Sequence, residues 1–492
     1  MPNGVYIDIT EISQRGDSIY GVEYLRDIKW KRNLHAKSKT RYIELQVWRW
    51  GDLSIYKYLA LKLAEFGVPM KRKPESEILG QIKANGELDA FLDFAQNFLS
   101  LHKNGNLKLR EINERFAAIK DKYLRERSLR FLRLYSSYYL LYQEYLDAER
   151  GYDFADMINI ATQNVRELPG CASGYRYILL DEVQDLSRNR QELILAILQK
   201  NPSCKLFAVG DDWQSIYRFT GSNLELIRKF DQVFQRPTRR SLIESTHRFA
   251  LPTLKISSEF VQKNPMQARK HVRSGKKTQT PIEIIFNEPD EAIRGSDAPA
   301  FERAIKHLVD ELGFEKLQAK ELQIISRYNH DIARLSNSPN FKIDGATVYW
   351  RDPQDSAQCL KFEYCSMHKS KGITRDIVFV LNMNSDLMGM PAQRETDPII
   401  DTLLSQEESF PFAEERRLFY VAITRARERT ILLANRKNPS PFLFEVCSEL
   451  AQEENLLCPK CETGELIRKT TKRGNFYYCG NYRFGCDYFR RL

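Results

Sequence analysis

Two carboxylates follow a short apolar run at residues 177–180, in the sequence DEVQD at residues 181–185. The run has the length and composition of a buried parallel strand, so Asp181 and Glu182 would emerge at its carboxyl end, where open α/β sheets bind ligands. One such carboxylate could hold Mg²⁺ on a nucleotide, while its neighbour orients or deprotonates the attacking water. These residue types therefore indicate nucleotide hydrolysis.

That chemistry normally needs a glycine-rich phosphate loop, G-x-x-x-x-G-K-[ST], and the sequence contains none. The stretch SGKKT at residues 274–278 lacks the leading glycine, lies after the DEVQD box and follows no convincing strand. We interpret it as a basic surface loop. The expected carboxylate site therefore lacks the loop that would hold the phosphates.

A second polar stretch, VGDDWQSIYRFTGS at residues 209–222, also follows a strand-like run. It presents Gln214 at the predicted sheet edge. The rings of Tyr217 and Phe219 and the guanidinium of Arg218 could stack on bases and contact phosphate. The alternative is that the two rings pack in a core.

Two further stretches add positive charge. SMHKSKGIT at residues 366–374 predicts a basic, glycine-bearing loop between two strands, which is a plausible phosphate contact. EERRLFYVAITRAR at residues 414–427 predicts a helix with one apolar stripe and with Arg425 at its far end. A solvated surface arginine is the alternative interpretation of Arg425.

In this order, the four stretches resemble the motifs of superfamily 1 DNA helicases of the UvrD/Rep type, over about residues 150–435. YDFAD at residues 152–156 is similar to the segment that precedes DExQD in that family. The short distance from Arg248 to His368 leaves no room for the family's large inserted accessory domain, so helicase IV is the closer likeness. The resemblance implies ATP with Mg²⁺ as cofactors and 3′ to 5′ movement on single-stranded DNA, or on a duplex with a single-stranded tail.

The resemblance also implies roles by position. Asp181 matches the magnesium ligand and Glu182 the catalytic base. Gln214 matches the residue that senses the γ-phosphate. Arg248 and Arg425 match two arginines that stabilise transition-state charge.

Other positions match the family's binding residues. Those that match nucleotide-contacting residues are Asp181, His247, Lys371 and Gly372. Those that match residues coupling nucleotide state to single-stranded DNA are Tyr217, Arg218, Phe219 and His368. The chain departs from the family pattern at His247, which replaces a tyrosine that stacks on adenine, and at Thr374, which replaces a carboxylate thought to meet the ribose.

Four of the nine cysteines lie near the C-terminus. They are Cys458, Cys461, Cys479 and Cys486. Two short-spaced pairs around a hairpin-length stretch are typical of a four-thiolate zinc ribbon, and the spacing resembles the ribbons of bacterial type I topoisomerases. Lysine, arginine and aromatic residues between the pairs suit single-stranded DNA, with a purely structural zinc site as the alternative.

The rest of the sequence predicts an α/β protein with RecA-like (P-loop NTPase) parallel sheets, the first of them incomplete. We expect a remnant of a nuclease-like α/β domain at 1–72, a helical subdomain at 73–150, the C-terminal part of a first RecA-like domain at 151–250, a second RecA-like domain at 251–445 and a zinc ribbon at 455–492. Strands are expected at 4–9, 41–45, 177–180, 206–209, 282–286, 322–326, 364–367, 377–381 and 430–434, and an irregular loop at 391–411.

The net charge of +10 favours a polyanionic partner. No apolar stretch approaches the roughly 20 residues needed to span a bilayer, and no secretory leader is recognisable, so a cytoplasmic location is expected.

Our leading hypothesis is the C-terminal portion of a helicase motor that is weak or inactive alone and needs a second polypeptide carrying the phosphate loop. A non-motor DNA-binding or interaction protein and a truncated product without stable function are the alternatives.

Overall fold

The structure is a computed structural model. It describes residues 4–10, 21–46, 54–68, 73–276, 282–287, 296–355, 357–393, 396–404, 408, 410–447, 458–460, 466–471, 474–479 and 486–491. The chain divides into two units, one comprising residues 1–164 and 397–404 and the other residues 165–396 and 405–492. Among the described helices, none combines the length and apolar character that crossing a bilayer requires.

The first unit opens with a small α/β layer. Its elements are β1 (Val5–Thr10), α1 (Gly21–Lys37), β2 (Arg41–Gln46) and α2 (Ser54–Glu65). The two strands pair in parallel, which requires a crossover, and α1 is that crossover. Val5, Ile43 and Leu45 are buried, with Leu59 and Leu63 of α2 packed against them. The expected strands are confirmed; the nuclease-like origin stays a prediction.

Helices fill the rest of the first unit. They are α3 (Glu75–Ala84), α4 (Glu87–Asn104), α5 (Leu109–Ala117), α6 (Lys122–Ala148) and α7 (Phe154–Glu167). Phe98 and Tyr135 lie fully buried in their common core. The buried Lys103 of α4 forms ion pairs with Asp153 (2.5 Å) and Asp156 (2.6 Å) at the start of α7. The YDFAD segment thus connects the start of α7 to α4 through ion pairs.

A short helix lies where the sequence predicted an irregular loop. Helix α14 (Pro398–Asp401) belongs to the first unit, although the residues on both sides of it belong to the second. Ile399 and Ile400 are buried in the helical core, and Asp397 pairs with Arg127 of α6 (2.5 Å). The prediction of a loop across 391–411 is therefore wrong here. Ile399 and Ile400 stand alone among polar residues and prolines, so the sequence pattern did not indicate that they belong to a core.

The largest sheet belongs to the second unit and has the order β7-β13-β12-β8-β11-β10-β9. Its strands are β7 (Ile282–Asn287), β8 (Leu322–Ser326), β9 (Phe341–Asp344), β10 (Thr347–Arg351), β11 (Cys359–Ser366), β12 (Arg375–Val380) and β13 (Ala426–Asn435). Strands β7, β13, β12, β8 and β11 are parallel, as predicted. Strands β10 and β9 are antiparallel, so the sheet is mixed rather than wholly parallel.

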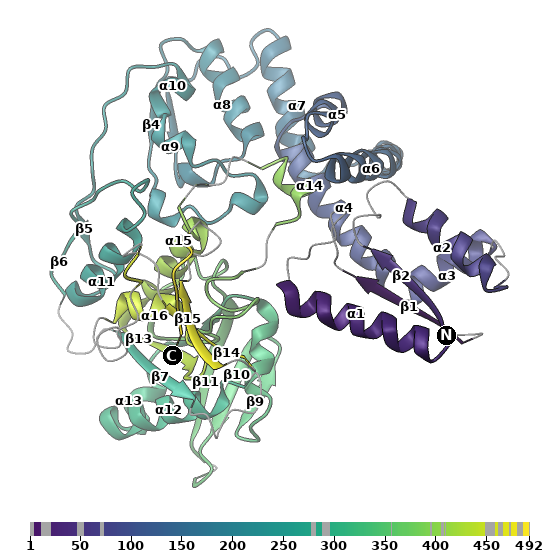
Figure 1. Ribbon diagram of the computed structural model, residues 1–492. Helices are drawn as coiled ribbons and strands as arrows, with labels where there is room; N and C mark the ends of the chain where they lie inside the picture. The colour runs from purple at the N-terminus through teal and green to yellow at the C-terminus, as the bar shows by residue number, and fades with distance from the viewer. Residues whose placement is uncertain are drawn as a thin grey trace. The chain divides into compact units, whose positions relative to one another are not determined.

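Both faces of this sheet are covered (Figure 1). Helices α11 (Leu251–Gln262), α15 (Ala413–Ile423) and α16 (Pro441–Val446) share one core with it, and α12 (Ala298–Leu312) and α13 (Phe314–Gln318) share the other. Neighbouring strand residues alternate between the two cores: Leu432 lies in the first, and Ile431 and Leu433 in the second. Continuous apolar strands are the expected consequence.

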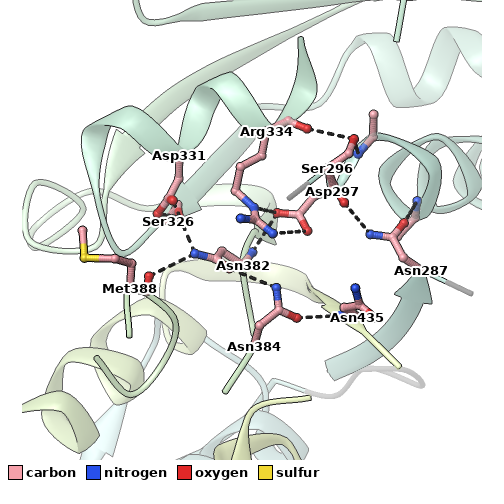
Figure 2. A network of polar contacts seen from close by, with 12 residues as sticks. Asn287, Ser296, Asp297, Ser326, Asp331, Arg334, Asn382, Asn384, Met388 and Asn435 are labelled. Carbon is pink, nitrogen blue, oxygen red and sulfur yellow. Dashed lines mark hydrogen bonds and ion pairs between the residues drawn. The ribbon is translucent and has the colours of Figure 1, made fainter. Parts of the chain in front are cut away.

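A polar network fixes the carboxyl ends of several of these strands (Figure 2). Asp297 is fully buried and accepts from Nε of Arg334 (2.6 Å) and from the backbone N–H of Asn382 (3.0 Å), just after β12. Asn384 Oδ1 accepts from the backbone N–H of Asn435 at the end of β13 (2.6 Å). The buried polar groups in this network satisfy one another, which indicates a structural role.

The other sheet of interest has two described strands, β3 (Tyr177–Leu180) and β4 (Lys205–Ala208), paired in parallel. Helix α8 (Arg188–Lys200) connects them and covers one face, where Ile178, Leu180 and Leu206 pack with Ile194 and Leu198. A further short parallel pair joins β5 (Ser245–Thr246) to β6 (Arg273–Ser274). The expectation that the first RecA-like sheet is incomplete stays a prediction.

Near the C-terminus, β14 (Leu466–Thr471), β15 (Gly474–Cys479) and β16 (Phe489–Arg491) form an antiparallel sheet. Strands β14 and β15 lie between the two cysteine pairs and β16 follows the second pair, an arrangement compatible with the predicted ribbon.

Candidate nucleotide and DNA site

The DEVQD box emerges from the carboxyl end of β3, as predicted. Asp181 and Glu182 are exposed, and the backbone of Glu182 has φ 49°, a left-handed conformation that is unfavourable for a residue with a side chain. Gln184 holds this turn in place: its Nε2 donates to the carboxylate of Glu182, and its Oε1 accepts from the backbone N–H of Asp211 (3.0 Å). The turn after β3 is thereby tied to the loop after β4.

Lys270 organises the loop after β4. Its ammonium group pairs with Asp211 (2.5 Å) and Asp212 (2.5 Å) and lies over the ring of Trp213. Burial opposes its charge, but the two carboxylates outweigh burial and raise the pKa of Lys270. Asp211 also accepts from Nε2 of Gln214 (2.6 Å), which orients that predicted phosphate sensor. Sequence reasoning missed Lys270, because it lies far along the chain in a stretch with no motif.

Lys371 reaches the DEVQD carboxylates from the loop after β11. Its Nζ lies 2.5 Å from Asp185 and 3.4 Å from Glu182, and it donates to the backbone carbonyl of Gln214 (2.9 Å). Burial raises the pKa of Asp185, although Lys371 acts in the opposite direction. Gly372 follows with φ 82°, a conformation that favours glycine. The predicted nucleotide contact Lys371 and the predicted catalytic base Glu182 therefore lie side by side.

Arg425 is buried, so the interpretation as a solvated surface arginine is wrong. Its side chain is 1% exposed; Nε donates to the carbonyl of Val421 (2.7 Å) and Nη2 to the hydroxyl of Thr424 (3.1 Å). Nη1 has no hydrogen-bond partner, and no carboxylate pairs with Arg425, in the part of the chain that the structure describes. Burial, and then repulsion from Arg248, lower its pKa to about 9. A buried cation in this state favours an anion beside it.

Arg248 and His247 follow β5. Arg248 is half-buried and acts electrostatically on Arg425, whereas His247 is exposed. The two predicted transition-state arginines are therefore close enough for their charges to repel each other. His247 presents an open ring to solvent, as a base-stacking residue would, but nothing else about its surroundings distinguishes it.

The predicted DNA-coupling residues form an aromatic cluster. The hydroxyl of Tyr217 donates to the carbonyl of His368 (3.0 Å), and the ring of His368 meets Phe219 edge-on, with 5.0 Å between ring centroids. Phe219 remains exposed and Arg218 half-buried. Burial, and then Arg327, lower the pKa of His368 to about 4. The alternative of simple core packing for Phe219 does not fit its exposure.

Helix α15, which packs on the seven-stranded sheet, also contacts the segment that bears this cluster. Glu414 accepts from the backbone N–H of Arg218 (3.0 Å), and Nε of Arg417 donates to the carbonyl of Ser215 (2.6 Å). Arg417 also pairs with Glu408, which accepts from Arg228 (2.6 Å). All eleven residues of α15 except its two glutamates are buried, so the predicted single apolar stripe is wrong. Its charged residues are internal connectors.

Three of the four predicted zinc ligands converge. The sulfur atoms of Cys458, Cys479 and Cys486 all lie within 4.8 Å of one another, and 3.7 Å separates Cys458 Sγ from Cys486 Sγ. Tetrahedral zinc with bonds of about 2.3 Å places its sulfurs roughly 3.8 Å apart, and the separation of Cys458 and Cys486 is close to that value. Cys461 lies outside the described residues.

Comparison with known families agrees with the geometry. Residues 25–235 match the UvrD/REP helicase N-terminal domain, and residues 351–437 match the UvrD-like helicase C-terminal domain. The chain thus carries sequence of both domains and is homologous to superfamily 1 DNA helicases of the UvrD/Rep type.

Individual helicases are also similar to the chain in sequence. The chain is 34% identical to DNA helicase IV of Escherichia coli over 298 residues, covering 61% of this chain and 39% of the relative. It is 23% identical to a probable DNA helicase of Mycoplasma pneumoniae, covering 65% and 55% of the two chains. Identity to the ATP-dependent DNA helicase Rep of Escherichia coli is 26%, with 45% and 33% covered. The chain spans about a third to just over half of these relatives' lengths.

Proposed function

We propose that this chain forms part of an ATP-dependent superfamily 1 DNA helicase or translocase that moves 3′ to 5′ on single-stranded DNA. We further propose that a second polypeptide supplies the phosphate loop. The observation that carries the proposal is the buried Arg425, which has no counter-ion among the described residues and lies in the field of Arg248. A pair of cations in this state suits the charge that develops on a transferred phosphoryl group.

The residues divide the chemistry between them. Asp181 would hold Mg²⁺, whose charge neutralises phosphate oxygens, and Glu182 would accept a proton from the attacking water. In the structure Lys371 occupies the space beside Glu182 and Asp185. The ammonium group of Lys371 therefore lies 3.4 Å from the carboxylate that we propose as the base.

The same contacts connect nucleotide chemistry to DNA. Lys371 donates to the carbonyl of Gln214, and three residues further on Tyr217 donates to His368, in the loop that bears Lys371. The loop after β4 and the loop after β11 are therefore fastened together twice. A shift of Gln214 or Lys371 toward phosphate would move Phe219, whose exposed ring suits stacking on a base.

ATP hydrolysis with single-stranded DNA tests the proposal. We expect the purified chain to hydrolyse ATP weakly or not at all, because nothing in its sequence cradles the β- and γ-phosphates. Addition of the phosphate-loop polypeptide should produce DNA-stimulated hydrolysis, which Glu182→Gln should abolish.

A mixture that stays silent while the chain still binds DNA would reject the motor and leave a non-motor DNA-binding protein. Arg188→Ala serves as the control, because Arg188 is an exposed residue of α8 paired with Glu192 (3.1 Å).

We propose separately that Cys458, Cys461, Cys479 and Cys486 hold zinc in a ribbon that contributes to DNA binding. The short separation of three buried thiols supports this. The purified protein should contain about one equivalent of zinc, and Cys458→Ser should remove it, whereas Cys447→Ser should not. Zinc content below about half an equivalent, unchanged by Cys458→Ser, would remove the ribbon from the proposal.

A further inference from the structure

The two-stranded sheet of β3 and β4 has one apolar face that the described part of the chain leaves without cover. Tyr177 is 66% exposed, Leu179 74% and Phe207 62%. Leu179 and Phe207 are cross-strand partners, so the side chains form one continuous surface on the face opposite α8. Parallel strands are normally buried on both faces, and an exposed apolar patch of this kind marks an interaction surface.

A second segment with the same character leads into Arg248. Leu242 and Ile243 are 60% and 77% exposed, and they lie just before β5. Among the described residues, neither Leu242 nor Ile243 joins a strand ladder. The segments that deliver Glu182, Gln214 and Arg248 to the candidate site therefore each expose apolar side chains along part of their length.

We infer that β3, β4 and residues 241–244 form the docking surface for a separate α/β polypeptide that carries a G-x-x-x-x-G-K-[ST] loop. This inference rests on the proposed function and adds the surface by which the missing loop arrives. Strand edges offer unpaired N–H and C=O groups, so an incoming strand pairs there while its helices cover Leu179 and Phe207. A strand added parallel to β4 ends at the edge where Glu182 and Gln214 lie, and delivers its following loop to them.

A second copy of this chain is a poorer occupant. It would cover apolar surface but bring no phosphate loop, since the sequence contains none. The buried Arg425 would still lack an anion.

The experiment captures partners of the whole tagged chain from its native cells and identifies them by mass spectrometry. We expect one stoichiometric polypeptide that contains G-x-x-x-x-G-K-[ST]. Its recombinant form should bind the purified chain, and the double variant Leu179→Lys/Phe207→Lys should weaken binding by more than about 100-fold. The control Leu387→Lys alters an equally exposed apolar residue of the same unit, and should change binding by less than about twofold.

Both substituted side chains are exposed in the free chain, so the double variant should keep its melting temperature. Absence of a phosphate-loop polypeptide, equal binding by the double variant, or self-association of the chain through this face would each overturn the inference. DNA-stimulated ATP hydrolysis that survives the double substitution would keep the motor and reject the docking surface. A complex that forms through this face and hydrolyses no ATP would keep the docking surface and reject the motor.

Discussion

Gly210 lies at the tightest point of the candidate site. A Cβ atom at this position would lie 2.6 Å from Cγ1 of Val183 and 2.7 Å from Oε1 of Gln184. Gly210→Ala should therefore push Gln184 away from Asp211 and Glu182. We expect a loss of about 1–3 kcal/mol in the free energy of unfolding. Chemical denaturation of the whole chain measures this loss.

Gly275→Ala is the matched control, because a Cβ there meets no atom within 4 Å. Equal stability of the two variants would contradict the close contacts predicted for a Cβ atom at position 210.

The ring of His368 should remain neutral far below ordinary pH. Burial, and then Arg327, lower its folded pKa to about 4, whereas the unfolded value is about 6.5. The unfolded chain binds the proton first, so the contribution of neutral His368 to stability is complete above about pH 6.5 and is lost as pH falls toward 4. The size of this loss is about 3 kcal/mol.

An NMR titration of the His368 ring measures this pKa directly. The unfolding free energies of the native chain and of His368→Gln should approach each other as pH falls from 7 to 4, because only the native chain loses the contribution of neutral His368. A His368 midpoint near 6.5 would contradict the buried environment.

At the scale of elements, Arg416 in helix α15 and Arg425 in the turn between α15 and β13 are both buried, but in opposite situations. Arg416 pairs with Glu445 through two nitrogens (2.6 and 2.9 Å), whereas Arg425 has no carboxylate partner among the described residues. Arg416→Met leaves the buried Glu445 with Lys263 (2.8 Å) as its remaining partner, so it should destabilise the chain by less than about 3–5 kcal/mol, which is the cost of a wholly unpaired buried charge. Arg425→Met removes an uncompensated charge and should be neutral or stabilising.

Thermal melting of both variants checks this expectation. The same Arg425→Met chain should lose about 10³-fold or more of the ATP hydrolysis of the reconstituted complex. Equal destabilisation by the two substitutions would show that Arg425 is a structural residue.

Sequence periodicity predicted the parallel strands well, because continuous apolar runs such as residues 377–381 match buried strands. It missed the hairpin of β9 and β10, although the two-residue turn between them begins with Gly345, which has φ 58°. It also missed Lys270 and Glu408, whose roles arise only when distant segments meet. Local patterns do not encode such contacts.

At the scale of the whole molecule, the net charge of +10 should dominate DNA affinity. Counter-ion release predicts that the logarithm of the association constant for single-stranded DNA falls with the logarithm of salt concentration, by about 0.7 for each phosphate neutralised. Arg218→Ala should reduce this slope by about 0.7, measured by fluorescence anisotropy with a labelled oligonucleotide.

Arg110→Ala removes an exposed charge of α5 that already pairs with Glu114 (2.9 Å) and should leave the slope unchanged. A native slope near zero would exclude phosphate contacts as the source of affinity.

Helix α14 has a consequence for anyone dividing this protein into fragments. The backbone passes from one unit to the other at residues 164–165, returns at 396–397 and leaves again at 404–405. A fragment that ends at residue 164 would lack Ile399 and Ile400, two members of its own hydrophobic core. The complementary fragment would carry both isoleucines without their packing partners. Expression of the helical unit alone should therefore require residues 397–404 as an added peptide or a circularly permuted fusion.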